Sequence, residues 1–186
     1  MPAVFLLSTT SSFVSDLKYG ALYLNKGNGL FDDITEKSGI AAAMAGKGGW
    51  GAAFFDYDND GDLDLITANG TAEELVLQYP LLMENDGAGN FSADASSNFV
   101  QLAGGADVDV ADVDNDGDFD ILMSGATDAF DVHTILYIND GLGQFTELAS
   151  ANLQNTFGGT NSIADMDNDG DLDIVIVGSQ AGGLPN

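Results

Sequence analysis

The chain contains one nine-residue acidic motif three times, at residues 56–64, 112–120 and 165–173. Each copy reads D-x-D-N-D-G-D-x-D. In such a loop, side-chain oxygens at positions 1, 3, 5 and 9 and a backbone carbonyl at position 7 can converge on one hard cation, while glycine at position 6 permits the sharp turn. A solvated acidic turn could explain one copy, but it is a poor explanation of three copies that share the same glycine and the same asparagine at position 4. The motif therefore predicts three metal sites.

The predicted ion is calcium, because the loops offer only oxygen ligands and the whole chain has one histidine and no cysteine. Magnesium requires a smaller and stricter octahedron and usually keeps several waters. The predicted metal residues are the five aspartates of each loop: Asp56, Asp58, Asp60, Asp62, Asp64, Asp112, Asp114, Asp116, Asp118, Asp120, Asp165, Asp167, Asp169, Asp171 and Asp173.

The segments around the loops distinguish them from EF-hands. A Gly-Gly pair and a short apolar strand precede every loop, and an aliphatic strand follows it. An EF-hand has helices on both sides and a glutamate at position 12, but position 12 here is Thr67, Met123 or Ile176. Residues 34–44 are the one helical candidate, weakened by a glycine and a threonine.

The loops recur after 56 and then 53 residues, a spacing that indicates repeated β units. Each unit reads strand, acidic loop, strand, variable loop, strand, N-x-G-x-G-x-F turn and strand. Four antiparallel strands in succession make one blade of a propeller. We therefore predict an all-β fold of propeller-type four-stranded blades, with about three blade equivalents in the chain.

The units divide the chain at their Gly-Gly pairs. Residues 1–20 are rich in serine and threonine and match no later segment, so we interpret them as an N-terminal arm. The expected divisions are the arm at 1–20, a half blade with the last two strands at 21–47, blades at 48–103 and 104–157, and a half blade with the third loop at 158–186. Three blade equivalents are fewer than the ~4–8 of a closed propeller, so bare strand edges are expected.

Net charge excludes one class of partner. The formal charge is −26, and 15 of the 30 acidic residues lie in the three loops. The cations are four lysines, none of them after Lys47, so there is no basic surface for nucleic acid. No apolar run approaches the ~18 residues of a membrane span, and the absence of cysteine excludes disulfides.

Catalytic residues are hard to find outside the loops. His133 stands beside a strand, where a surface or core role is expected, and no serine lies in a G-x-S-x-G elbow. A glycosidase needs a carboxylic acid held in an apolar pocket. Only Glu84, Glu147 and the pair Glu73 and Glu74 remain as candidates, by elimination. We therefore interpret the chain as non-enzymatic.

Two further sets of residues suggest binding or modification. Trp50 and Tyr79 can line a sugar or peptide site, although core packing beside the Gly-Gly turn suits Trp50 better. Asn69 and Asn90 begin glycan acceptor tripeptides, of which Asn69 is the better candidate if it lies in a loop.

A family resemblance emerges from these patterns. Gly-Gly, a short strand, the acidic loop and an aliphatic strand resemble the FG-GAP/VCBS repeat of integrin α-type propellers, and residues 157–159 retain Phe-Gly-Gly. Residues 31–58 are similar to acidic secreted FG-GAP proteins of the cartilage acidic protein type. The resemblance covers residues 21–178. It implies a propeller fold, calcium in each loop and an extracellular or cell-surface location, but no particular ligand.

These observations support three functional hypotheses. In the first, the chain is a calcium-binding extracellular protein whose complementary half blades associate head to tail, as a ring or a fibre. In the second, it is a segment of a larger adhesion propeller that binds a protein or a carbohydrate. A glycosidase-like accessory or catalytic domain is the third and weakest hypothesis.

Overall fold

The fold was obtained as a computed structural model that describes residues 3–7, 20–70, 77–128 and 131–180. These residues form thirteen strands, one helix and one 3-10 turn. The elements are β1 Ala3–Leu7, β2 Gly20–Gly27, β3 Leu30–Asp33, α1 Ile40–Ala43, β4 Gly49–Phe55, β5 Asp64–Asn69, β6 Leu81–Asn85, β7 Phe91–Ala93, β8 Gly104–Ala111, β9 Asp120–Asp128, β10 Asp131–Asn139, β11 Phe145–Glu147, η1 Ala149–Ala151, β12 Phe157–Ala164 and β13 Asp173–Ser179.

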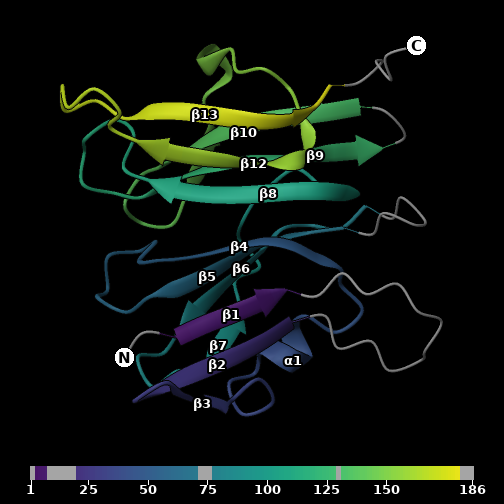
Figure 1. The fold of residues 1–186 in the computed structure, drawn as a ribbon, viewed down its shortest axis with the longest axis vertical. Helices are drawn as coiled ribbons and strands as arrows, with labels where there is room; N and C mark the ends of the chain where they lie inside the picture. Colours follow the sequence, from purple (N-terminus) through teal and green to yellow (C-terminus); the bar gives the residue numbers. More distant parts are fainter. Residues whose placement is uncertain (1–2, 8–19, 71–76, 129–130, 181–186) are drawn as a thin grey trace.

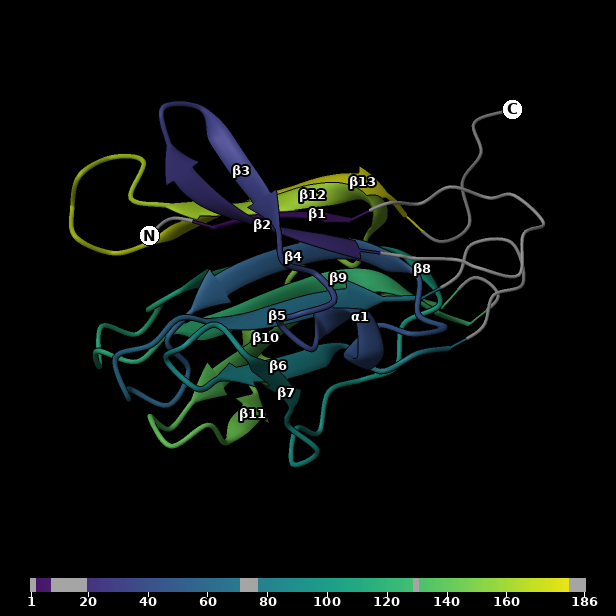
Figure 2. The ribbon, with the colours of Figure 1, turned by 90° about the horizontal axis from the view of Figure 1, so that it is seen from below.

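The strands form four antiparallel sheets, with the orders β1-β2-β3, β4-β5-β6-β7, β8-β9-β10-β11 and β12-β13. The first strands of successive sheets, β1, β4, β8 and β12, lie beside one another in that order. Figures 1 and 2 show the sheets spreading outward from this row of strands, as the blades of an incomplete propeller do. The prediction of an all-β fold built from four-stranded blades is therefore confirmed.

The second strand of each complete blade is buried on both faces, because another sheet covers each side. All six residues of β5 are buried. Leu65 packs into the core shared with the first sheet, whereas the next residue, Ile66, packs into the core shared with the third sheet. Burial on both faces explains why an uninterrupted aliphatic run follows the acidic loop.

Two hydrophobic cores lie between the first three sheets. The larger core joins the second and third sheets and includes the ring cluster of Phe55, Tyr57, Phe99 and Phe145. The smaller core lies beside the first sheet and contains Leu22, Ile40, Met44, Leu65 and Met83. Helix α1 supplies Ile40 and is confined to four residues inside the predicted segment 34–44. It begins after Gly39, whose φ of 85° suits glycine.

The first sheet corrects the prediction that residues 1–20 match no repeat. β1 pairs with β2 so that Val4 faces Tyr23, and β5 pairs with β6 so that Leu65 faces Met83. β1 therefore holds the place of a second blade strand, and the first sheet has three strands, not the two expected of a half blade at 21–47. The sequence suggested a strand or arm here but did not reveal its place in a blade, because the segment carries neither an acidic loop nor a Gly-Gly pair. Residues 8–19 lie outside the described part of the chain.

The last sheet consists of β12 and β13, and the described residues cover it on one side only. The third sheet lies against β12, where Asp107 accepts hydrogen bonds from the Asn161 amide (2.6 Å) and the Thr160 hydroxyl (3.0 Å). On β13, by contrast, Val175 and Val177 are 56% and 57% exposed. The equivalent residues of β5 are fully buried, so the same aliphatic pattern occurs here on an open surface.

Candidate metal centre

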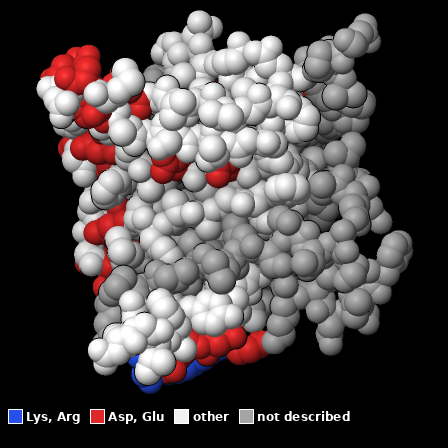
Figure 3. Space-filling model, viewed as in Figure 1, with Lys and Arg blue, Asp and Glu red and all other residues white. Residues whose placement is uncertain are grey.

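The three acidic loops connect the first and second strands of the last three sheets. They lie at one end of the strands, and Figure 3 shows acidic side chains gathered along that edge of the molecule. Position 9 of each loop is the first residue of β5, β9 or β13. The strand therefore fixes the position of the carboxylate at position 9, while the turn determines where the other carboxylates of the loop lie.

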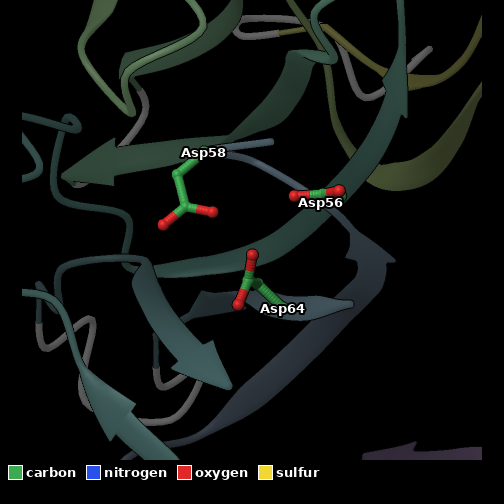
Figure 4. Close-up of side chains that lie close together, drawn as sticks. All are labelled: Asp56, Asp58 and Asp64. Atoms are coloured by element: carbon green, nitrogen blue, oxygen red, sulfur yellow. The ribbon is translucent and has the colours of Figure 1, made fainter. Parts of the chain in front are cut away.

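In each loop the structure brings together the carboxylates of positions 1, 3 and 9. One oxygen from each of these residues lies within 4.8 Å of the others. Figure 4 shows the first set facing a common space, with two side chains from the loop after β4 and one from the start of β5. The three sets are Asp56, Asp58 and Asp64; Asp112, Asp114 and Asp120; and Asp165, Asp167 and Asp173.

The turn between positions 3 and 9 follows from two residue types that tolerate left-handed backbone. In the first loop, Asn59 at position 4 has a φ of 61° and Gly61 at position 6 has a φ of 95°. The carboxylate of Asp56 accepts hydrogen bonds from the amides of Asp60 (3.1 Å) and Gly61 (3.0 Å). The second and third loops repeat these bonds, so the acidic side chain at position 1 itself closes the turn.

The carboxylate at position 9 is buried in the two complete blades. Asp64 accepts hydrogen bonds from the amides of Tyr57 (3.2 Å) and Asn85 (2.7 Å). Asp120 accepts equivalent bonds from Val113 (2.8 Å) and Asn139 (2.9 Å). These bonds hold the oxygens in place without neutralising their charge.

Burial and mutual repulsion disfavour the charged carboxylates in the absence of a cation. Burial raises the pKa of Asp64 to about 6, and it also raises the pKa of Asp120. The pKa of Asp58 is raised by burial and then by the negative charge of Asp60. In the third loop Asp173 is exposed, because the last sheet has no hairpin to cover it in the described residues.

The predicted ligands at positions 5 and 7 lie outside these groups. The carboxylate at position 5 instead accepts the amide of position 7, at 2.9, 2.9 and 3.0 Å in the three loops. At position 7, the side chains of Asp62 and Asp118 lie against Gly87 and Gly141, where a Cβ atom would collide with them. The structure thus gathers nine of the fifteen aspartates. The ligand role of all fifteen stays a prediction, and the six that lie outside the groups are Asp60, Asp62, Asp116, Asp118, Asp169 and Asp171.

The donor set suits a hard divalent cation. Each group offers only carboxylate oxygens, without histidine nitrogen or sulfur. Among the described residues, the two ion pairs found lie elsewhere and join Lys26 to Asp32 and His133 to Asp131. No basic side chain of the described residues therefore neutralises the groups, and each group could hold a metal ion.

The hairpin asparagines were missed as part of the site. Asn85 and Asn139 open the N-x-G-x-G-x-F turns, which the sequence suggested only as structural hairpins. In the structure their amides hold the position 9 carboxylates. The available signal was the recurrence of an asparagine at a similar distance after both loops, since Asn85 follows Asp64 by 21 residues and Asn139 follows Asp120 by 19.

The candidates for catalysis lie apart from one another. His133 pairs with Asp131 on β10 at 3.1 Å and is about one-third exposed. Glu84 and Glu147 are exposed, and neither belongs to one of the three carboxylate groups. Glu73 and Glu74 lie outside the described residues. Of the described candidates, His133, Glu84 and Glu147 do not form a group of three ligand-bearing side chains with one another.

The binding and glycan candidates have distinct environments. Trp50 is half-buried against the larger core and donates a hydrogen bond to the Gly70 carbonyl at 3.0 Å, in agreement with a packing role. Tyr79 is 59% exposed. Asn69 corrects the glycan prediction: it ends β5, is fully buried and donates to the Tyr79 carbonyl at 3.1 Å. Asn90 is the exposed one of the two acceptor asparagines.

Comparison with known protein families gives one match. Residues 6–67 match the model of the FG-GAP-like repeat. The match begins at Leu6 and ends at Thr67, which hold the same register position in the first and second sheets. It therefore spans one repeat, with one complete acidic loop, and confirms the resemblance over this segment. No curated protein matches the chain. Within the described residues, α1 is far too short to cross a membrane.

Proposed function

We propose that this chain, which carries an FG-GAP-like repeat at residues 6–67, is a non-enzymatic, calcium-stabilised repeat protein of the adhesion type that works outside the cell. The observation that carries the proposal is the threefold gathering of carboxylates at positions 1, 3 and 9, with no basic partner in the part of the chain that the structure describes. One such cluster is an ordinary surface feature. Three in the same place of successive sheets indicate one repeated task.

Calcium fits the loops better than magnesium does. Besides the three gathered carboxylates, each loop has a carboxylate at position 5 and a backbone carbonyl at position 7 within the same turn. Calcium accepts six to eight oxygen ligands in flexible geometry, whereas magnesium keeps several waters and requires a strict octahedron. A flexible, ligand-rich loop therefore favours calcium.

The proposed role of calcium is to join the first two strands of each blade. Like charges within 4.8 Å repel one another in the folded protein, and burial of Asp64 and Asp120 adds to that cost. A bound divalent ion reverses the sign of this interaction. Because unfolded loops do not preserve the site, binding energy becomes folding energy.

The extracellular setting is proposed from the ligand set and the repeat family. The loops lack the bidentate glutamate that gives intracellular calcium sensors their affinity. Such loops are expected to fill where calcium is abundant, and FG-GAP-like repeats are typical of adhesion proteins there. The ligand of this proposed adhesion protein would be a protein or a glycan.

Thermal unfolding with calcium, with a chelator and with magnesium tests the proposal. We expect calcium to raise the Tm well above that of the chelated protein, and magnesium to give a smaller rise. Asp114→Asn should lose part of the calcium-dependent rise, whereas Asp140→Asn removes the same charge from a hairpin turn and should retain it. An unchanged Tm after chelation would contradict the proposal.

Head-to-tail association is a second candidate function, favoured by the open β12-β13 sheet. Among the described residues, the outer edge of β13 has no strand partner and Val175 and Val177 are exposed beside it. A hairpin from a second copy would cover both features. However, β1 already covers β2 of the first sheet, so β2-β3 can accept β13 only if β1 is displaced. Sedimentation in millimolar calcium distinguishes the outcomes, because a stable monomer contradicts this second candidate.

A further inference from the structure

Two of the three acidic loops are joined directly by a side chain. Asn59, at position 4 of the first loop, donates a hydrogen bond to the carboxylate of Asp118 at 2.6 Å. Asp118 is position 7 of the second loop, fifty-nine residues away. The same Asn59 amide lies 3.5 Å from the carbonyl of Gly141, in the hairpin that covers the second loop. Asn59 itself has a left-handed backbone, with a φ of 61°.

A second asparagine bonds to both loops from the hairpin of the third sheet. The buried amide of Asn139 donates to the carbonyl of Tyr57 in the first loop at 2.8 Å. It also lies 3.2 Å from the carbonyl of Phe119 in the second loop. The backbone amide of the same residue donates to Asp120, a member of the second carboxylate group. Gly143 of this hairpin lies against the Tyr57 ring, where a Cβ atom would collide.

From these contacts we infer that the sites at 56–64 and 112–120 bind their cations cooperatively, and that Asn59 and Asn139 are the positioning residues that couple them. The inference rests on the proposed function, since it concerns the same calcium loops. The inference goes beyond the proposed function, because calcium sites that bind independently would fulfil that function equally well.

The physical basis is that ordering one loop places groups needed by the other. A cation in the first loop fixes the turn that carries Asn59, and Asn59 then holds Asp118. The backbone carbonyl of Asp118 is the position 7 ligand expected for the second cation. Conversely, an ordered second loop fixes Asp118 and Asn139, which hold Asn59 and the Tyr57 carbonyl. Coupling of this kind must be equal in both directions.

The third loop provides an internal comparison. Asn115 has the same loop position as Asn59 and the same left-handed backbone, with φ of 60°. In the described part of the chain, however, its amide makes no hydrogen bond to residues 165–173, and the last sheet has no hairpin in the place of 139–145. The third site is therefore inferred to bind independently of the other two.

The test is a calorimetric calcium titration in a chain whose third site is removed by Asp167→Ala. Affinity of the first loop is measured with the second loop intact and with Asp114→Ala, and affinity of the second loop with and without Asp58→Ala. We expect each loop to lose about fivefold or more in affinity when its neighbour is disabled. The two losses should be equal.

Asn59→Gly is the informative variant, because glycine keeps the left-handed backbone and removes only the amide. In the Asn59→Gly chain, disabling one loop should lower the calcium affinity of the other loop by a smaller factor than in the parent chain. Asn115→Gly, the matched change in the second loop, should leave that factor unchanged. Asn139→Ala and its counterpart Asn85→Ala provide a second comparison, because the side-chain amide of Asn85 donates within its own blade, to the Leu63 carbonyl. Circular dichroism in calcium confirms that each variant is folded.

Three outcomes are distinguishable. Coupling that Asn59→Gly weakens supports the inference. The inference is overturned, with calcium binding intact, if each loop has the same calcium affinity whether or not the other loop is disabled. It is also overturned if the coupling survives both Asn59→Gly and Asn139→Ala. No calcium uptake by any folded variant contradicts the proposed function itself.

Discussion

Replacing one aliphatic residue after an acidic loop should have very different effects in different blades. Ile66 and Val175 are each the second residue after the position 9 aspartate. Ile66 is fully buried between the second and third sheets, whereas Val175 on β13 is 56% exposed. Substitutions at this one repeat position therefore allow a covered blade surface to be compared with an open one within the same chain.

Ile66→Ala removes methyl and methylene groups from a core that cannot collapse around the cavity, and such changes typically cost about 2–5 kcal/mol. Val175→Ala removes atoms that already contact water, and we expect a change within about 0.5 kcal/mol. For a chain of this size each kcal/mol lowers the Tm by about 2–4 °C.

Denaturant unfolding of both variants in saturating calcium, at one protein concentration, provides the measurement. We expect a large loss of unfolding free energy for Ile66→Ala and almost none for Val175→Ala, with similar m-values. A loss for Val175→Ala as large as that for Ile66→Ala would refute the reasoning, because β13 would then be covered in solution. A loss that grows with protein concentration would indicate the second copy as the cover.

Three further predictions concern the loops and the approach of the sheets. Asp58→Ala should abolish calcium binding at the first loop, whereas Asp62→Asn, outside the gathered carboxylates, should retain it; calorimetric stoichiometry checks both. Gly51→Ala should destabilise the fold by about 1–3 kcal/mol, because its Cβ would meet the Val108 amide of β8; Gly89→Ala, where a Cβ meets open space, should cost about 1 kcal/mol for its positive φ alone. Because burial raises the pKa of Asp64 to about 6, the folded metal-free protein holds that proton more tightly than the unfolded chain does. The stability of the metal-free protein should therefore fall as the pH rises from about 4 to about 7. The calcium-loaded protein should show the opposite trend, because calcium binding needs ionised carboxylates. Tm series with and without calcium separate the two.

Much of the blade pattern was readable from the sequence, because the repeated loop fixes which segments precede and follow it. The acidic motif, the aliphatic strand and the N-x-G-x-G-x-F turn give the order of strands in the two complete blades. The place of β1 in a blade was not recognised, since the strand alone carries no motif and only its pairing with β2 reveals that place.

Within the loops, the sequence could predict the oxygen chemistry but not which oxygens meet. The sequence does not distinguish the five aspartates of a loop from one another. In the structure, the turn at Asn59 and Gly61 brings three of their carboxylates together. It leaves Asp62 against Gly87 of the neighbouring hairpin. Contacts between blades, such as Asn59 with Asp118, join residues 59 positions apart and have no signal in a local pattern.

The most direct test of the account is the number of calcium ions bound per folded chain. Purified protein, dialysed against millimolar calcium in excess magnesium, is assayed for both metals by atomic emission. We expect three calcium ions and no magnesium per wild-type chain, and two calcium ions after Asp58→Ala or Asp167→Ala. A folded wild-type chain that retains no calcium, or that retains magnesium in its place, would contradict the account.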